Sequence, residues 1–343
     1  MISTGGWIRD NQHVGCHNHL FMRARKLGRS NDLALRVPSR FCRPVGKWCR
    51  YIVAAVLLPL LRSGYHLLLM LKVLLCPPDY FDVVDQKNPY MTPRSVVDRV
   101  KARQQWEALR GALQHCGCEV KTIDPVEGLE DMVFAANQVF LGARNGDGQF
   151  VVPSRMVYPS RQREVPFYVG WCCRRGYQVI ELALGEDYLE GHGDLLWHPD
   201  GSRIYAGYGF RSTRGGVEKF AAAMSKMGIP VVSLQLVDPY CYHLDTCLCP
   251  LNHEAALVFP GAFSAESLAT LHKFWKRVHV LTSEEAYRFM GNGIVANGSY
   301  ITPHVTLRLE AILGQEGLRP VVVETSEFEK SGGSCSCLKM FLP

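Results

Sequence analysis

The chain has 343 residues, enough to bury a full core, and its 47% apolar and 20% charged residues are typical of a globular protein. Thirteen cysteines, an odd number without repeated metal-type spacing, argue against a disulfide scaffold and indicate reduced thiols inside a cell, in the cytoplasm or an organelle. The net charge of +6 comes from residues 1–50, which hold ten Arg and Lys against Asp10 and Asp32. The remaining residues are slightly acidic, which argues against a nucleic-acid-binding body.

The first seventy residues differ in pattern from the rest. A basic stretch precedes residues 51–70, a largely apolar run that Pro59, Arg62 and His66 interrupt. Basic residues before an apolar run are typical of a membrane anchor or of a targeting leader. However, an arginine near the centre of a bilayer costs about 3 kcal/mol. Three interpretations of residues 1–70 stay open: an anchor, a targeting leader and a dispensable extension. Any membrane contact is expected only through residues 51–70.

After residue 70, short β-rich runs alternate with amphipathic segments. Thr92 followed by Pro93 predicts the start of a helix that runs to about Gln114. The predicted strands are 71–75, 119–123, 132–141, 150–152, 177–182, 203–206, 230–236, 255–258, 278–281, 300–302 and 320–323. Further helices are predicted at 163–175, 215–227, 264–275, 283–289 and 304–315. Because no linker rich in Pro, Gly and Ser interrupts residues 71–343, we interpret them as one mixed α/β domain.

Two motifs place polar side chains beside predicted strands, where α/β proteins often carry functional groups. The first brackets an apolar run with Asp131 and Asn137. A strand with a cap and a turn asparagine is the alternative interpretation. The second motif, E-G-H-G-D, places Glu190 and Asp194 around His192, and its glycines let the acids crowd one small site. An exposed glycine turn is the alternative here.

A third motif contains His243 and Asp245, whose spacing places both side chains on one face if the segment is a strand. A neighbouring carboxylate can orient an imidazole and tune its proton transfer. The alternative is a buried structural histidine. Cys241, Cys247 and Cys249 lie nearby, but their spacing fits no usual tetrahedral zinc pattern. No metal site is therefore expected.

The C-terminal residues 330–343 read K-S-G-G-S-C-S-C-L-K-M-F-L-P. The two adjacent glycines allow the backbone to approach a bound group, so Cys335 and Cys337 are candidates for a thiol nucleophile. Two inert cysteines buried on a terminal strand are the alternative. One thiol, one histidine and several carboxylates together predict attack on a cationic substrate. Acidic groups position a guanidinium, and the bound cation favours the thiolate.

The order of six motifs resembles that of the guanidine-modifying superfamily: D-M-V-F-A-A-N, Y-P-S-R-Q-R-E, E-G-H-G-D-L-L-W, G-Y-G-F-R, Y-H-L-D-T-C-L-C-P-L and K-S-G-G-S-C-S-C-L. This superfamily includes dimethylargininases, arginine deiminases, arginine dihydrolases and arginine:glycine amidinotransferases. The resemblance covers the chain from about residue 71 to its end. It implies the α/β propeller called a pentein, in which five ββαβ modules surround a pseudo-fivefold axis with the active site in the central channel.

The resemblance also implies roles for single residues. Cys337 matches the nucleophile, and His243 matches the histidine that protonates the leaving amine and later activates water. Glu190 and Asp194 match the acidic motif that orients the histidine and holds the guanidinium. Asp245 matches a further guanidinium contact.

Four more residues are expected to bind substrate. Asn137 falls where several branches carry aspartate, and asparagine there resembles the arginine dihydrolase branch. Arg161 resembles a residue that binds the substrate carboxylate, with Arg211 as a second candidate, and Asp131 belongs to the first motif. Two departures are Lys339, where relatives often carry threonine, and His192, inside the acidic motif.

By this resemblance the chain is a hydrolase that acts on the guanidinium of arginine or a methylated arginine and needs no cofactor. The Cys337 thiolate attacks the guanidinium carbon, His243 protonates the leaving amine, and water hydrolyses the thiouronium intermediate. An amidinotransferase that passes the amidino group to an amine shares the first half of this reaction. A non-catalytic arginine-binding protein is the third hypothesis. The expected partner is a small guanidino molecule, no nucleic acid is expected, and an oligomer stays open.

Overall fold

The computed structural model describes residues 70–92, 95–144 and 148–343. Its contacts divide the chain into two units, Met1–His66 and Leu67–Pro343. The predicted leader at residues 1–70, with its apolar run at 51–70, lies outside the described residues except for its last residue. None of the helices in the described ranges has the length and apolar content needed to cross a bilayer.

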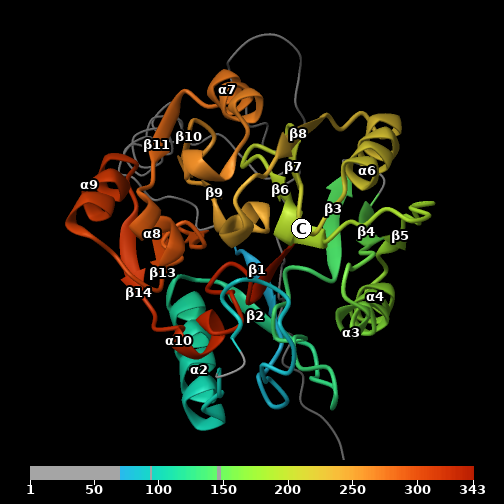
Figure 1. Ribbon diagram of the computed structural model, residues 1–343, viewed down its shortest axis with the longest axis horizontal. Helices are drawn as coiled ribbons and strands as arrows, with labels where there is room; N and C mark the ends of the chain where they lie inside the picture. The colour runs from blue at the N-terminus through green and yellow to red at the C-terminus, as the bar shows by residue number, and fades with distance from the viewer. Residues whose placement is uncertain (1–69, 93–94, 145–147) are drawn as a thin grey trace, which may run out of the picture. The chain divides into compact units, whose positions relative to one another are not determined.

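The second unit is an α/β fold built on five sheets of three strands. In each sheet the central strand pairs antiparallel with one neighbour and parallel with the other. The sheets are β15-β1-β2, β3-β4-β5, β6-β7-β8, β9-β10-β11 and β12-β13-β14. Figure 1 shows them arranged around a common centre. The strands are β1 (Lys72–Leu75), β2 (Glu119–Thr122), β3 (Val139–Arg144), β4 (Gly148–Pro153), β5 (Gln178–Val179), β6 (Leu195–Trp197), β7 (Ile204–Tyr208), β8 (Val231–Gln235), β9 (Leu248–Pro250), β10 (Ala255–Val258), β11 (Arg277–Val280), β12 (Ile294–Ala296), β13 (Ser299–Thr302), β14 (Arg319–Val322) and β15 (Lys339–Leu342).

A helix links the central strand of each sheet to the parallel strand that follows it. Such a crossover is required because two parallel strands cannot be joined by a tight hairpin. These helices lie on the outside of the ring of sheets in Figure 1. They are α2 (Arg99–His115), α4 (Val165–Cys173), α6 (Arg214–Lys226), α7 (Ala265–Phe274) and α9 (Leu307–Gln315). Shorter helical segments are α3 (Pro159–Gln162), α5 (Gly191–Asp194), α8 (Ser283–Tyr287) and α10 (Ser326–Glu329), with 3-10 turns η1 (Pro239–Cys241), η2 (Leu244–Thr246) and η3 (Pro260–Ala262).

The start predicted for the first helix is wrong. α2 begins at Arg99, and the Asp98 side chain caps it by accepting a hydrogen bond from a first-turn backbone N–H. Thr92 lies before the helix, and the side chain of Val96 is 79% exposed. The apolar face that packs into the core is instead carried by later positions such as Trp106. A strong cap six residues downstream therefore replaced the predicted one.

The strand predicted at 132–141 is also wrong in its first half. Residues 132–138 form consecutive turns, and β3 begins only at Val139. Backbone bonds such as Phe134 N–H to Asp131 O close these turns. The strands β6, β9 and β12 were not predicted, because three residues are too few to show a period of two.

Candidate active site

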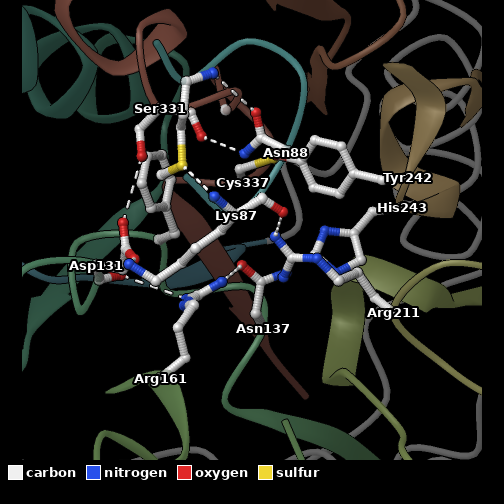
Figure 2. Close-up of a pocket in the computed structure, with 13 residues that line it drawn as sticks. Lys87, Asn88, Asp131, Asn137, Arg161, Arg211, Tyr242, His243, Ser331 and Cys337 are labelled. Carbon is white, nitrogen blue, oxygen red and sulfur yellow. Dashed lines mark hydrogen bonds and ion pairs between the residues drawn. The ribbon is translucent and has the colours of Figure 1, made fainter. Parts of the chain in front are cut away.

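One narrow pocket collects most of the predicted site residues (Figure 2). The predicted residues that line it are Asp131, Asn137, Arg161, Arg211, His243 and Cys337. Gly333, one of the two glycines noted in the sequence, also lines it, and the lining residues that sequence reasoning missed are Lys87, Asn88, Met91, Phe134, Tyr242 and Ser331. Residues from widely separated parts of the chain thus share one cavity.

Cys337 lies in a turn between α10 and β15, where the Leu338 N–H donates to Ser334 O over 3.2 Å. The alternative that places Cys335 and Cys337 on a terminal strand is therefore wrong, because the strand begins only at Lys339. Gly332 adopts φ +81°, and a Cβ at Gly333 would lie 2.5 Å from the Phe134 ring, so both positions require glycine. This tight turn holds the Cys337 side chain at the pocket.

The two cysteines of this turn have different surroundings. Cys335 is fully buried among apolar side chains, and this burial raises the pKa of its thiol to about 12. Cys337 instead faces the pocket, with its Sγ 3.4 Å from Oδ2 of Asp245. Burial and the Asp245 carboxylate together raise the pKa of the Cys337 thiol well above its usual value. The thiol is therefore protonated in the unliganded pocket.

Asp245 supplies a carboxylate directly beside this thiol. Burial raises the pKa of Asp245 to about 6, so the group remains mostly ionised at neutral pH. Among the described residues its Oδ1 has no hydrogen-bond partner. An unpaired buried carboxylate oxygen is costly unless a donor arrives to satisfy it. A guanidinium is such a donor.

The strand considered for His243 and Asp245 is not formed, because residues 244–246 are a 3-10 turn. His243 occupies the position just before the 3-10 turn η2, and its Nε2 lies 2.8 Å from Oε2 of Glu190. Burial lowers the pKa of His243 to about 4 although this carboxylate opposes the shift, so the imidazole is neutral at rest. The carboxylate that orients the histidine is thus Glu190.

Glu190 is fully buried and also pairs with Arg211, whose Nη1 lies 2.9 Å from Glu190 Oε2. Burial alone would raise the pKa of Glu190, but the Arg211 guanidinium and His243 outweigh it and hold this pKa well below the usual range. Arg211 is itself placed between the rings of Tyr158 and Tyr242, each 4.8 Å away. Glu190 therefore carries a fixed negative charge behind the histidine.

Asp194 does not line the pocket. Its Oδ2 accepts a hydrogen bond from Ser212 Oγ at 2.6 Å, and its Oδ1 accepts one from the Leu244 N–H at 3.1 Å. Burial raises the pKa of Asp194 well above its usual value. The side chain connects the end of α5 to the backbone next to His243, which is a positioning arrangement.

Asn137 and Arg161 face each other across the pocket wall. Arg161 Nη1 donates to Asn137 Oδ1 at 3.0 Å, and Arg161 Nη2 lies 3.2 Å from Glu164 Oε2. Since a guanidinium only donates, the oxygen of Asn137 faces Arg161 and its Nδ2 faces elsewhere. Among the described residues this Nδ2 has no hydrogen-bond partner.

Asp131 is neutralised by Lys87, whose Nζ lies 3.0 Å from Asp131 Oδ2. Its other oxygen accepts from Ser331 Oγ at 3.3 Å. These contacts join the segment before α2 to the turn that carries Cys337. Asn88 makes a second link, because its Nδ2 donates to Ser331 O at 2.9 Å.

The two residues that depart from the family pattern, His192 and Lys339, both lie outside the pocket lining. The His192 ring lies 4.6 Å from that of Phe140, and its Nε2 accepts the Leu141 N–H at 3.0 Å. Lys339 is buried at the start of β15, with its Nζ 4.8 Å from the centre of the Phe341 ring. Neither residue lines the pocket.

Some of the missed residues are sequence neighbours of predicted site residues and could have been found for that reason. Tyr242 and Ser331 stand inside the Y-H-L-D and K-S-G-G motifs already singled out. Lys87 and Asn88 lie in a segment without regular structure and share no local pattern with the rest of the site. Across the described part of the chain, no group of three or more His, Cys, Asp or Glu side chains is placed to hold a metal ion.

Sequence comparison supports the superfamily expectation. A family model described as N,N dimethylarginine dimethylhydrolase, eukaryotic, matches residues 85–342. An N(G),N(G)-dimethylarginine dimethylaminohydrolase of Mycobacterium tuberculosis is 35% identical over 261 residues, which are 76% of this chain and 82% of the relative. The bifunctional arginine dihydrolase/ornithine cyclodeaminase ArgZ of Synechocystis is 33% identical over 273 residues, or 79% of this chain and 37% of that longer protein.

Solved structures agree with this relation. The N-terminal domain of ArgZ, in a variant covalently bonded to a reaction intermediate, is similar with a TM-score of 0.73 and 32% identity over 80% of this chain and 98% of that one. A variant of AgrE in complex with L-arginine is similar with a TM-score of 0.74 and 32% identity over 80% of this chain and 40% of that one. The resemblance to guanidine-modifying enzymes is thereby confirmed, and the chain belongs to the N,N dimethylarginine dimethylhydrolase family.

Proposed function

We propose that this protein hydrolyses the guanidinium group of arginine or a methylated arginine, with Cys337 as its nucleophile. The observation that carries the proposal is the composition of one pocket. It contains a thiol 3.4 Å from the Asp245 carboxylate, together with a histidine held by Glu190 at 2.8 Å. The relatives named for dimethylarginine and arginine hydrolysis, and the covalent intermediate in ArgZ, support the same chemistry.

Substrate binding prepares the nucleophile. The guanidinium would donate to the unpaired Oδ1 of Asp245, and its positive charge would lie beside the Cys337 sulfur. A nearby cation stabilises the thiolate over the thiol and opposes the raised pKa of Cys337. Arg161 is the first candidate for the substrate carboxylate and Arg211 the second. Each already pairs with one carboxylate of the protein, Arg161 with Glu164 and Arg211 with Glu190.

The chemical steps then follow in order. The thiol proton passes to the neutral His243, and the sulfur attacks the guanidinium carbon. His243 returns this proton to the nitrogen that leaves as ammonia or an alkylamine, and the carbon–nitrogen bond breaks. His243 next accepts a proton from water as its oxygen adds to the thiouronium carbon. The carbon–sulfur bond then breaks and the remaining hydroxyl proton passes to the departing sulfur, which leaves a ureido product and the Cys337 thiol. The fixed charge of Glu190 stabilises each transient imidazolium.

Asn137 supports a further hydrolysis of the first product. Because Arg161 holds Oδ1, the unpaired Nδ2 of Asn137 is an N–H donor, which suits a ureido oxygen better than a guanidinium. A ureido product retained in this way can undergo a second attack by Cys337. Arginine would then yield ornithine, ammonia and carbon dioxide.

The catalytic domain proposed for this reaction is residues 71–343, preceded by the basic leader. The five sheets with one shared topology support the pseudo-fivefold propeller implied by the resemblance, with the pocket at its centre. The presence of a nucleophile, a base and a backing carboxylate argues against a protein that only binds arginine, since binding needs no thiol.

One assay tests the proposal and its alternatives. The purified protein is incubated with arginine, with dimethylarginine, and with arginine plus glycine, and the products are identified by mass. We expect citrulline or ornithine from arginine, or citrulline from dimethylarginine, and no product with the Cys337→Ser variant. An amidino group transferred to glycine would favour the amidinotransferase instead, and no turnover of any substrate would contradict an enzyme of this class.

A further inference from the structure

The Asn292 side chain joins the two segments that meet at the nucleophile. It is fully buried in the turn between α8 and β12. Its Nδ2 donates to Asp245 O at 2.9 Å and lies 3.3 Å from Cys337 Sγ. Its Oδ1 accepts from the backbone N–H groups of Ser334 at 3.2 Å and Cys337 at 3.3 Å. Both the nitrogen and the oxygen of the Asn292 side chain therefore bind groups of the two segments that carry Asp245 and Cys337.

The chemistry of these partners determines which way the amide faces. Backbone N–H groups only donate, so the atom facing Ser334 and Cys337 must be the oxygen. The Asp245 carbonyl only accepts, so the atom facing it must be the nitrogen. The second N–H of Asn292 is consequently the one that reaches the sulfur. A donor at this place favours a charged sulfur over a neutral one.

The local backbone is shaped to aim this side chain. Phe289, two residues after the end of α8, adopts φ +57°, a conformation that is rare for a bulky residue. Its ring packs 4.8 Å from that of Tyr90, and its carbonyl accepts the Asn292 N–H at 3.0 Å. The Asn292 carbonyl in turn accepts the Ser336 N–H at 2.9 Å. A left-handed residue of this kind is retained only where the surrounding structure holds it in place.

We propose that Asn292 is a catalytic residue, which donates a hydrogen bond to the Cys337 sulfur as it becomes a thiolate and holds that sulfur beside Asp245. The proposal rests on the function proposed above and adds a residue to it. In the unliganded pocket the thiol directs its own hydrogen at Asp245 Oδ2. Once that proton has left, Asn292 remains as the side-chain donor in contact with the sulfur.

Two substitutions separate the contributions of Asn292. Asn292→Asp keeps an oxygen for the two backbone N–H groups but removes both donated hydrogen bonds and adds a negative charge. Asn292→Ala removes the donor without adding charge, so it isolates the effect of the lost hydrogen bond. The matched control is Asn297→Asp, in the β12–β13 turn, where the Nδ2 donates only to Cys116 O at 2.8 Å, away from the pocket.

The first measurement needs no substrate. Alkylation of Cys337 by iodoacetamide is followed by peptide mass across a range of pH, with Cys337→Ser as the blank. Asp245, Tyr242 and Lys339 lie around this thiol, His243 shares its pocket, and all four side chains are present in every variant. We expect both Asn292 variants to need a higher pH for half-maximal alkylation. The Asn297→Asp variant should follow the wild type.

The second measurement is turnover. We expect kcat to fall about 10- to 100-fold in both Asn292 variants, the usual effect of losing a hydrogen bond to a charged group, with a smaller change in KM. A wild-type alkylation profile in Asn292→Ala would overturn the proposal, even if its activity fell, because the residue would then act only on the fold. If the wild type consumed no guanidino compound, the proposed function would fail while the alkylation profile still decided the role of Asn292.

Discussion

The Nε2 atom of His243 lies 2.8 Å from Oε2 of Glu190, and both side chains are buried. The same carboxylate binds Arg211, which keeps it ionised. A buried carboxylate fixed behind an imidazole orients the ring and stabilises the imidazolium that forms when the ring takes a proton. Under the proposed function, Glu190 would act through His243 without touching the substrate.

From this geometry we expect Glu190→Gln to lower kcat by roughly 10²-fold, the usual scale for a damaged acid–base group. The glutamine keeps the shape but loses the charge and leaves the Arg211 guanidinium unpaired. Steady-state kinetics with the substrate identified above are the measurement. The control is Glu218→Gln, which changes an exposed glutamate paired with Arg214 and should keep wild-type rates. Equal rates in both variants would remove Glu190 from the mechanism.

Cys337→Ser should abolish turnover, whereas Cys335→Ser should retain it. Of the two thiols, that of Cys337 lines the pocket and contacts Asp245, whereas Cys335 is fully buried and is not among the residues that line the pocket. Burying a hydroxyl in place of the Cys335 thiol should instead lower stability, by about 1 to 3 kcal/mol. Activity and thermal unfolding of both variants are compared. An inactive but stable Cys335→Ser variant beside an active Cys337→Ser variant would reverse the assignment.

Asn137→Asp should shift the product of arginine from ornithine towards citrulline. A carboxylate at this position accepts from a guanidinium but offers no donor to a ureido oxygen, so the first product would leave before a second attack. Products are quantified by mass for both proteins under the same conditions. Citrulline as the sole product of the wild type would contradict the second hydrolysis. In that case the deiminase or dimethylargininase reaction would be favoured.

His192 should make the protein less stable in acid. Burial lowers the pKa of His192 from 6.5 to about 3, so the unfolded chain binds a proton that the folded chain does not. The free energy of unfolding therefore falls as the pH drops from about 6.5 to about 3, by up to about 2 kcal/mol at pH 5. Urea unfolding at pH 7 and pH 5 should show a smaller loss for His192→Gln than for the wild type. Identical losses would show that His192 does not titrate in this way.

Deletion of residues 1–69 should leave an active enzyme. All five sheets, the pocket and the family match lie beyond this segment. The measurements are yield, circular dichroism and kcat of the shortened protein against the full chain. An insoluble or unfolded product would show that the leader is needed by the catalytic domain.

Local sequence was sufficient for most elements of this fold and for several reactive groups. The strands of the sheets alternate with amphipathic stretches, and most observed elements overlap the predicted ranges. Cys337, His243 and Glu190 could be found because glycines and short polar motifs set them apart from the surrounding apolar strands. These features depend on periodicity and turn chemistry, which act between residues a few positions apart.

The pairing of these groups depended on the tertiary structure. Spacing alone offered Asp245, two residues from His243, as a neighbouring carboxylate, and only the resemblance implied Glu190; the histidine bonds Glu190, 53 residues away. Asp245 instead faces Cys337, which is 92 residues away, and Asn292 approaches the same sulfur from a third segment. Side chains from different modules meet because the five sheets surround one centre. Residues that meet in this way are far apart in the sequence, so no short-range periodicity or motif spacing predicts their contact. The physical neighbours of each charge, and hence its pKa and its role, were decided by that arrangement.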